Sequence, residues 1–336
     1  ELDFDTTIDL SDDYSVRCIK DGFYDSALLI EYCGEKILNL NDCEINSEKS
    51  AKNILRQTGA VDILLTQFSY AAWKGGRSNL NWRTSAANEK LETVQLQNSI
   101  FEPKYIIPFA SFMFFANGDN FYLNDAVNRP GDVVKKFLDE KVEVLVMKPG
   151  DRVGGGDQQV DSAAAERFWN FLYDNLENVP LEKFEGVVFE KLQANFLKYC
   201  SRIKSNNNIF FAKLLRFILP INVFHPITIF ITDYGQSVRL DYLTGEICMV
   251  GDAGVLSMNS EVLNFLFLNN FGFDTLTVNG SFEELVDGGF VHASRSLAIE
   301  NLNNLGRRVS PKMIFEVKLI VLFLFRLLKV LRKSRI

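Results

Sequence analysis

Polar side chains that could bind a ligand close two short apolar segments in the first part of the chain. The segments run over residues 35–42 and 61–69, and their closing polar residues are Asn39, Asn41 and Asp42 in the first and Gln67 and Ser69 in the second. Short apolar runs are typical of buried strands that deliver side chains to a site at their carboxyl ends. Asn39 and Asn41 alternate with leucines, and an amide buried without a partner costs about 1–3 kcal/mol. We therefore expect these side chains to bind either a ligand or the backbone of their own loop.

A second group of polar residues, dense in carboxamides and carboxylates, lies between residues 117 and 128. Its members are Asn117, Asp119, Asn120, Tyr122, Asn124, Asp125 and Asn128. Their oxygen atoms are the kind of ligand that Ca²⁺ and Mg²⁺ prefer, although the loop pattern that ends in a bidentate Glu is missing. Three interpretations are open: a site for a hard divalent cation, the polar wall of a pocket for a sugar or nucleotide, and an ordinary turn-rich loop.

Residues for a transition-metal centre or a nucleophilic triad are scarce. The two histidines, His225 and His292, are far apart in the sequence, and the five cysteines are spread without a C-x-x-C pair. Zinc and iron sites normally need several such ligands, so neither metal is predicted as a cofactor. An odd number of scattered cysteines also predicts reduced thiols and a cytoplasmic location.

The composition predicts a globular chain and limits its partners. The apolar share is 47%, the charged share is 24%, and 336 residues can bury a large core. A net charge of -7 argues against a nucleic-acid partner, because phosphate binding needs clustered Lys and Arg. Gly154, Gly155 and Gly156 lack the strand and the G-K-[ST] sequence of a phosphate-binding loop, and they predict a linker.

Hydrophobic periodicity and turn residues predict alternating strands and helices, which indicate an α/β layered domain. In the first half, strands are predicted at 15–20, 26–32, 36–40, 61–65, 104–115 and 142–147, and helices at 47–59, 86–101 and 132–139. Ser47 is expected to cap the first helix and Gly59 to end it. The second half predicts helices at 162–176, 184–201, 209–219 and 260–269, a meander of strands at 227–233, 237–242 and 246–250, and a short strand at 275–279.

The last segment, residues 313–331, is very apolar but is not predicted to span a membrane. Its longest uncharged run covers residues 319–325, whereas a span needs roughly 18 residues. At about 100° per residue, Lys318, Arg326, Lys329 and Lys333 share one narrow stripe. We expect this helix either to dock on the protein or to lie in an anionic membrane surface. The predicted domains are residues 1–155, residues 156–310 and the C-terminal helix 311–336.

The segment order of the first 150 residues resembles the metallo-β-lactamase superfamily, in particular its ascorbate-6-phosphate-lactonase-like branch. The resembling residues are Gly34-Glu-Lys-Ile-Leu38 and Val61-Asp-Ile-Leu-Leu-Thr66. In that family the second strand is followed by H-x-H-x-D-H, which binds one or two metal ions. Those positions fall here on Gln67, Ser69, Ala71 and Ala72, and the histidine of a later P-x-H motif falls on Ala110. The resemblance implies a four-layer αββα sandwich that has lost its metal ligands, with an appended C-terminal α+β region.

The chain resembles more closely the lactamase-like domain of CMP-N-acetylneuraminic acid hydroxylase and its bacterial relatives. The similarity rests on Leu38-Asn-Leu-Asn-Asp-Cys43, Leu65-Thr-Gln-Phe-Ser69 with Trp73, Pro108-Phe-Ala-Ser111, Asn120-Phe-Tyr-Leu-Asn-Asp125 with Asn128, Pro149-Gly-Asp151 and Gly272-Phe-Asp-Thr-Leu-Thr-Val-Asn279. It implies ligand contacts for the polar and aromatic residues of the site motifs, including Trp73, Ser111 and Asp151. The chain departs from the full hydroxylases in lacking the paired Cys and His ligands of their Rieske domain. It also has Asn117-Gly-Asp119 in place of an expected H-x-E.

Three functions are therefore expectations from the sequence. The first is a metal-free lactamase-fold protein that binds a nucleotide-sugar-like or other anionic polar ligand, beside a Rieske or other oxygenase protein. The second is a metal-dependent hydrolase or oxygenase with an unconventional Asn/Asp site, so the question of catalysis stays open. The third is a non-catalytic interaction or peripheral membrane protein organised by the C-terminal helix.

Overall fold

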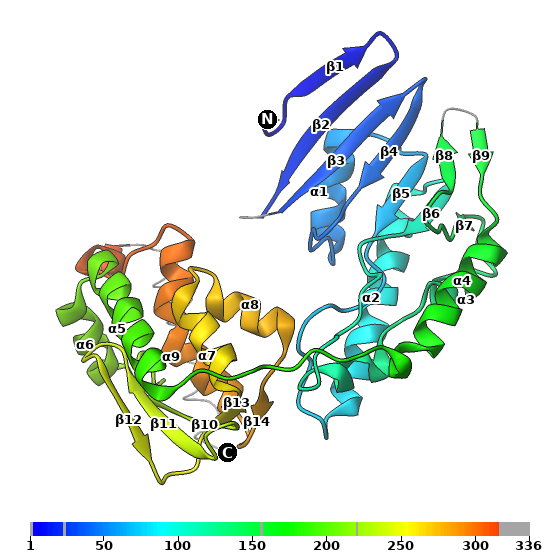
Figure 1. Ribbon diagram of the computed structural model, residues 1–336. Helices are drawn as coiled ribbons and strands as arrows, with labels where there is room; N and C mark the ends of the chain where they lie inside the picture. The colour runs from blue at the N-terminus through cyan, green and yellow to red at the C-terminus, as the bar shows by residue number, and fades with distance from the viewer. Residues whose placement is uncertain (1–2, 23–24, 155–156, 220, 316–336) are drawn as a thin grey trace, which may run out of the picture. The chain divides into compact units, whose positions relative to one another are not determined.

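The computed structural model describes residues 3–22, 25–154, 157–219 and 221–315, in two compact units that comprise residues 1–182 and 183–336 (Figure 1). The division follows residue 182 instead of the predicted glycine linker after residue 155, because the next helix packs on the first unit. In that helix Trp169 stacks on Phe112 with ring centroids 4.1 Å apart, and its indole N–H donates to the carbonyl oxygen of Met147 at 2.7 Å. The predicted C-terminal helix lies outside the described residues from residue 316 onward.

One seven-stranded sheet forms the first unit, and its strands follow one another in chain order. They are β1 (Thr7–Ser11), β2 (Tyr14–Asp21), β3 (Asp25–Tyr32), β4 (Glu35–Asn39), β5 (Ile63–Thr66), β6 (Tyr105–Pro108) and β7 (Glu143–Val144). Strands β1 to β4 are antiparallel, whereas β4 to β7 are parallel. Parallel neighbours need crossover connections, which here contain α1 (Glu48–Thr58), α2 (Leu80–Phe101) and α3 (Pro130–Lys136). The carboxyl ends of β4, β5 and β6 therefore lie at one edge of the sheet.

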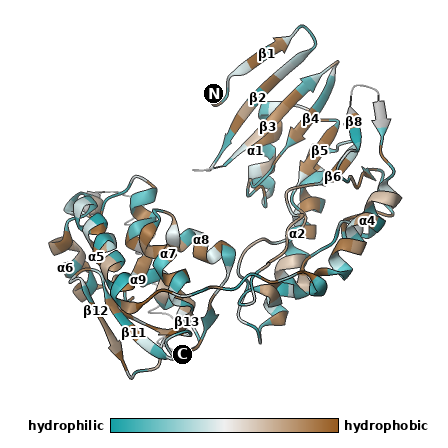
Figure 2. Ribbon diagram, in the orientation of Figure 1, coloured by the Kyte–Doolittle hydropathy of each residue, from teal (hydrophilic) through white to brown (hydrophobic). Residues whose placement is uncertain are grey.

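Helices α1 and α2 cover one face of this sheet. Ile54 of α1 and Phe101 of α2 pack with Leu38 and Leu64 of the central strands, which are largely hydrophobic (Figure 2). The predicted caps of α1 are present: the hydroxyl of Ser47 accepts the N–H of Ser50 at 3.2 Å, and Gly59 ends the helix at φ 68°. Helix α2 begins at Leu80 and not at the predicted Ala86. The remaining elements of the unit are η1 (Phe121–Ala126), the ribbon of β8 (Arg152–Gly154) and β9 (Asp157–Gln159), α4 (Ser162–Asp174) and η2 (Leu176–Asn178).

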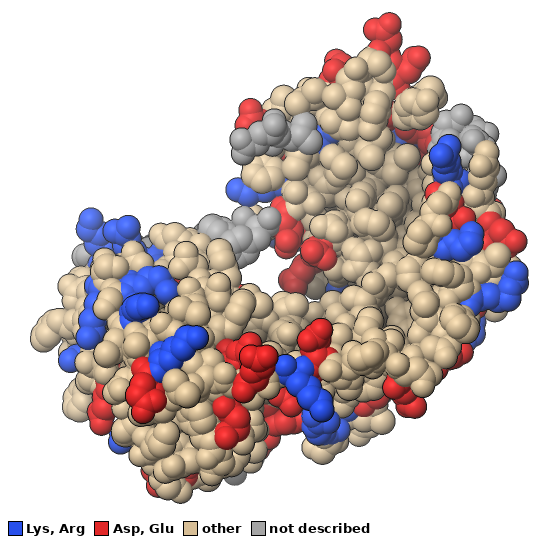
Figure 3. Space-filling model, viewed as in Figure 1, with Lys and Arg blue, Asp and Glu red and all other residues tan. Residues whose placement is uncertain are grey.

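The second unit combines a five-stranded sheet with helices, and its predicted meander is confirmed. The strand order is β12-β11-β10-β13-β14, with β10 (Ile227–Ile231), β11 (Gln236–Asp241), β12 (Glu246–Val250), β13 (Leu256–Met258) and β14 (Glu283–Glu284). The helices are α5 (Phe189–Asn206), α6 (Ile209–Ile218), α7 (Ser260–Leu268), α8 (Gly272–Asn279), α9 (Gly289–Asn304) and the 3₁₀ turn η3 (Pro311–Phe315). Lys and Arg side chains gather over the part of this unit that carries α5 (Figure 3).

The strand predicted at residues 275–279 is wrong, because this segment belongs to helix α8. Its β-branched Thr275, Thr277 and Val278 favour a strand locally. Tertiary packing overrides that preference, since Phe273 and Leu276 are buried three residues apart on one helix face. Gly280 then closes the helix at φ 69°, and its N–H donates to the carbonyl oxygen of Leu276 at 2.8 Å.

The predicted α/β fold class with an appended α+β region is confirmed by these two units. The four-layer αββα sandwich stays a prediction, because the described strands of the first unit form one seven-stranded sheet and the β8–β9 ribbon. Within the described residues, no helix is both long enough and apolar enough to cross a lipid bilayer.

Candidate functional site

Helix α2 is fastened to the edge where β4 and β5 end, and this contact shapes the candidate site. The side-chain oxygen of Gln97 accepts the hydroxyl of Thr66, the last residue of β5, at 2.6 Å. Its amide nitrogen donates to the carbonyl oxygen of Ile45, in the loop after β4, at 3.0 Å. Because Gln97 and Thr66 are both buried, these bonds hold the helix and the two strand ends in register.

A cavity of ≈ 140 Å³ lies between these elements. Its lining residues are Cys43, Glu44, Ile45, Asn46, Thr66, Gln67, Tyr70, Lys74, Ala86, Glu89, Lys90, Thr93 and Gln97. The members from α2 recur every three or four residues, so one face of that helix forms a wall. Of the residues predicted to bind a ligand, Gln67 is the one that lines this cavity directly.

The amine of Lys90 is the main charged group of the cavity. It is half-buried and donates to the side-chain oxygen of Gln67 at 2.9 Å, while the amide nitrogen of Gln67 donates to the carboxylate of Asp42. Burial lowers the pKa of Lys90 below its ordinary 10.5, and the positive charge of Lys74 lowers this pKa too, against the opposing effect of Glu44. None of the described carboxylates forms an ion pair with Lys90 at bonding distance, although Glu44, Asp42 and Glu89 all raise its pKa and so compensate part of its charge.

Cys43 is not a nucleophile for this cavity. Burial, reinforced by the carboxylates of Asp21 and Asp25, raises the pKa of its thiol to about 12. A thiol with such a pKa is protonated at neutral pH, and the thiolate is the reactive form. Its role is packing beneath the loop after β4.

Ser69, Ser111 and Asn128, which the sequence predicts as ligand contacts, come together, and their side chains bind backbone groups. The hydroxyl of Ser111 accepts the N–H groups of Phe68 and Ser69 at 3.1 and 3.2 Å, and the hydroxyl of Ser69 accepts the N–H of Asn128 at 2.9 Å. The Asn128 amide donates to the carbonyl oxygens of Phe68 and Ala87, both at 2.7 Å. These three side chains are buried, and they join the loops that follow β5 and β6.

Tyr122 and Asp125 also meet, around an arginine that the sequence did not single out. Arg83 of α2 is fully buried and forms a two-pronged pair with Asp125. Its guanidinium carbon lies 5.1 Å from the centre of the Tyr122 ring, and the Tyr122 hydroxyl donates to the carbonyl oxygen of Gly75 at 3.4 Å. The cluster secures the loop between β5 and α2.

The predicted cation cluster is a poor fit for a hard cation, because the side-chain oxygens of four of its members already accept hydrogen bonds. The side-chain oxygens of Asn117, Asn120 and Asn124 accept the N–H groups of Asp119, Asn117 and Phe115 at 2.9, 3.0 and 2.9 Å. Both carboxylate oxygens of Asp125 bind Arg83. Throughout the described ranges, no three His, Cys, Asp or Glu side chains are grouped to hold a metal ion.

The remaining predicted residues have local contacts. The side-chain oxygen of Asn39 accepts the N–H of Asn41 at 2.9 Å, which closes the turn after β4. Trp73 is buried against Trp82, with ring centroids 5.3 Å apart. Asp151 accepts the N–H and the amine of Lys148 at 2.9 and 2.7 Å, and these bonds hold the pKa of its carboxyl below its ordinary range.

The metal ligands that the family resemblance implies are not replaced by others. Gln67 and Ser69 occupy two of the expected positions, and both are engaged, the first with Asp42 and Lys90 and the second with Asn128. The other expected positions hold Ala71, Ala72 and Ala110, whose methyl groups cannot bind a metal. The residues at this edge therefore do not fit a zinc or iron centre of the usual kind.

Comparison with known proteins finds weak likenesses among solved structures. No family model and no curated protein matches the chain. CmlA, a diiron β-hydroxylase from Streptomyces venezuelae, has a TM-score of 0.30 and 12% identity over 43% of this chain and 32% of that chain. A putative Zn-dependent hydrolase of the metallo-β-lactamase superfamily from Thermotoga maritima has a TM-score of 0.28 and 15% identity over 42% of this chain and 68% of that chain. Igni18, a metallo hydrolase from Ignicoccus hospitalis, has a TM-score of 0.27 and 13% identity over 45% and 58%. The match therefore spans about a third of the CmlA chain, and scores this low carry no argument about function.

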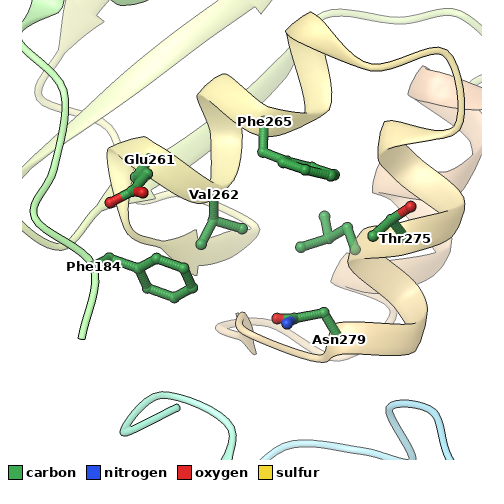
Figure 4. A pocket seen from close by; sticks show the side chains of 7 residues that line it. Phe184, Glu261, Val262, Phe265, Thr275 and Asn279 are labelled. Atoms are coloured by element: carbon green, nitrogen blue, oxygen red, sulfur yellow. The ribbon is translucent and has the colours of Figure 1, made fainter. Parts of the chain in front are cut away.

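A second cavity, of ≈ 280 Å³, lies in the second unit and is mostly apolar. Phe184, Val262 and Phe265 line one side of it, and Thr275 and Asn279 of α8 line the other (Figure 4). Its carboxylate, Glu261, accepts the N–H of Glu185 at 2.8 Å and so holds the segment before α5 in place. With its charged group already bound, this cavity offers fewer contacts to a polar ligand than the cavity at Lys90.

Sequence reasoning missed Lys74, Lys90, Thr66 and Gln97 because it searched strand ends and not the helix that covers them. A usable signal was present in the spacing of Ala86, Lys90, Thr93 and Gln97, which places polar groups on one helix face.

Proposed function

We propose that the chain has a metallo-β-lactamase-type fold without its metal ligands and binds a small anionic ligand in the cavity beside Lys90. One observation carries the proposal: a half-buried ammonium group whose described hydrogen bond goes to the neutral amide of Gln67. A charge withdrawn from water is costly unless it is paired. The carboxylates of Glu44, Asp42 and Glu89 act on Lys90 without a direct ion pair from the described residues, and an anionic oxygen in the cavity would supply one. Lys74 lies close enough to lower the Lys90 pKa, so the same anion would meet two ammonium groups.

The neighbouring carboxylates narrow the class of ligand. Glu44 and Glu89 line the cavity, and the carboxylate of Asp42 accepts a hydrogen bond from Gln67, which also lines it. Carboxylates accept hydrogen bonds from hydroxyl groups, whereas lysines bind carboxylate or phosphate. This mixture suits a sugar that carries an acidic group, such as the sialic-acid part of a nucleotide sugar.

The volume limits how much of the ligand is enclosed. At ≈ 140 Å³ the cavity is smaller than the roughly 300–1,000 Å³ of most small-molecule sites. It would enclose the acidic head of a nucleotide sugar and leave the nucleotide outside. This cavity contains neither a fitting metal-ligand set nor an ionised thiol, so any oxidation of the ligand would need a second protein. A Rieske or other oxygenase is proposed as that partner on the family resemblance.

Calorimetric titration of the full chain tests the proposal with four probes: CMP-sialic acid, free sialic acid, CMP and inorganic phosphate. We expect heat with CMP-sialic acid and free sialic acid, and Lys90→Met and Lys74→Met should each weaken binding about tenfold or more. Lys135→Met is the matched control, because Lys135 lines a separate hollow against another face of α2.

Absence of heat with all four probes, in a sample that circular dichroism shows to be folded, would overturn the proposal. Equal losses from Lys90→Met and Lys135→Met would also reject the cavity. Elemental analysis of protein purified without chelators addresses the alternative of a metal-dependent hydrolase or oxygenase, for which about one equivalent of bound metal is the expected result.

A further inference from the structure

Helix α6 presents an unusually apolar surface to solvent. Phe210, Leu214, Phe217 and Ile218 are 80%, 40%, 91% and 60% exposed. At about 100° per residue these four side chains fall within one arc of about 100°. The remaining sides of the helix are fixed to the unit, where Phe211 and Ala212 are buried and Arg216 binds Asp241 at 2.7 and 2.8 Å.

Basic residues flank this apolar face. Lys213 lies on α6 at the edge of the arc and is exposed. Arg307, Arg308 and Lys312 are also exposed, and the chain between them is fastened to the start of α6. There the N–H of Asn208 donates to the carbonyl oxygen of Val309, and the N–H of Val309 donates to the side chain of Asn207, both at 2.8 Å. Figure 3 shows Lys and Arg gathered over this part of the second unit.

We propose that the apolar face of α6, together with these flanking cations, binds peripherally to an anionic lipid surface. Aromatic and aliphatic side chains on one helix face and Lys or Arg beside it are the composition of helices that lie at a membrane interface. The charge pattern favours this occupant over a second copy of the chain, because two such surfaces would bring like charges together. The sequence beyond the described residues continues the pattern with Lys318, Arg326, Lys329 and Lys333 among apolar residues.

Co-sedimentation of the full chain with vesicles tests this inference independently of the proposed ligand cavity. We expect binding to vesicles of phosphatidylcholine with about one third phosphatidylserine, and at least about fivefold less binding to pure phosphatidylcholine. Phe210→Ser with Phe217→Ser should reduce binding about tenfold, and Arg307→Ser with Arg308→Ser should reduce both the binding and its sensitivity to salt. Phe171→Ser, which removes a 66% exposed Phe from α4 in the first unit, is the matched control and should bind normally.

Three outcomes would overturn the inference. The first is no binding to either vesicle by the folded wild-type chain. The second is normal binding by the Phe210→Ser, Phe217→Ser variant together with loss of binding when residues 316–336 are deleted, which would assign the contact to the C-terminal segment alone. The third is a wild-type dimer that this variant converts to a monomer without any lipid binding, which would make the face an interface between copies of the chain.

Discussion

The guanidinium group of Arg83 is fully buried and binds both carboxylate oxygens of Asp125, each at 2.7 Å. Its remaining N–H groups donate to the carbonyl oxygens of Gly76 at 2.6 Å and Arg77 at 3.2 Å. This single side chain thus joins the first turn of α2 to η1 and to the loop after β5. The hydrogen bonds that Arg83 donates to Asp125 raise the pKa of Arg83, so the guanidinium is charged at every pH at which the protein is folded.

Asp125→Asn should therefore destabilise the first unit by about 1.5–3 kcal/mol, because it removes the counter-charge of the buried Arg83, whereas the Asp125 side chain itself is 37% exposed to water. Urea unfolding followed by circular dichroism measures the change. Asp119→Asn is the control: Asp119 is exposed in the same loop, and its substitution should change stability by no more than about 0.5 kcal/mol. A loss below about 1 kcal/mol for Asp125→Asn would contradict the structural role assigned to the pair.

The ion pair of Arg83 also explains why the strands could be predicted from the sequence more accurately than the contacts of the site residues. Apolar runs place β4, β5 and the start of β6 within a few residues, since their pattern depends on local burial, and Ser47 and Gly59 act locally on α1. The strand predicted at 104–115 ends too late, because β6 stops at Pro108. The partner of Arg83 lies 42 residues away in the chain, and no local pattern pairs them. For the same reason the predicted ligand residue Asn128 could not be distinguished from a residue that binds backbone 41 and 60 residues away. The helix α8 was missed because packing of Phe273 and Leu276 outweighs the strand preference of the threonines around them.

Glu300 should make the stability of the second unit depend on pH. Burial raises the pKa of this 3% exposed carboxyl to about 7, and the opposing hydrogen bonds from Arg202 do not cancel that effect. Both bonds, at 2.5 and 2.8 Å, reach the same oxygen, and the other oxygen receives no hydrogen bond from the described residues. Between its ordinary pKa of 4.5 and about 7, the folded chain binds more protons than the unfolded chain. Stability should therefore fall as pH rises through that window, by at most about 3 kcal/mol.

Glu300→Gln should remove this slope, which urea unfolding at several pH values across the window can measure. The exposed Glu246 of β12 supplies the control, and Glu246→Gln should keep the slope of the wild-type chain. An unchanged slope in Glu300→Gln would mean that Arg202 keeps the carboxylate ionised and that other groups produce the pH dependence.

Lys90 should make both the stability of the first unit and its ligand affinity depend on pH. Its folded pKa is lowered from 10.5, so the unfolded chain holds more protons in the window just below 10.5, and stability should rise with pH there. An anion in the cavity favours the protonated amine. Affinity for sialic acid should therefore fall as pH is raised from about 7 toward 10.5, and binding near the lowered pKa should take up protons. Calorimetry in buffers of different ionisation enthalpy measures this uptake, which Lys90→Met should abolish. If the affinity for sialic acid does not change between about pH 7 and 10.5, Lys90 does not contact the ligand.

Substitution of Asn128 can distinguish a residue that stabilises a loop from a residue that binds the ligand. Its buried amide donates to the carbonyl oxygens of Phe68 and Ala87 at 2.7 Å, and neither bond leaves a donor for a ligand. Asn128→Ala should leave both carbonyl groups without this partner and lower stability by about 2–6 kcal/mol, at about 1–3 kcal/mol for each unsatisfied group. The affinity for sialic acid should remain within about twofold of wild type under conditions where the variant is folded, because the cavity beside Lys90 does not include Asn128. Asn88→Ala, on the exposed side of α2, should change neither quantity. If Asn128→Ala keeps its stability but loses affinity for sialic acid, Asn128 contacts the ligand, as the sequence predicts.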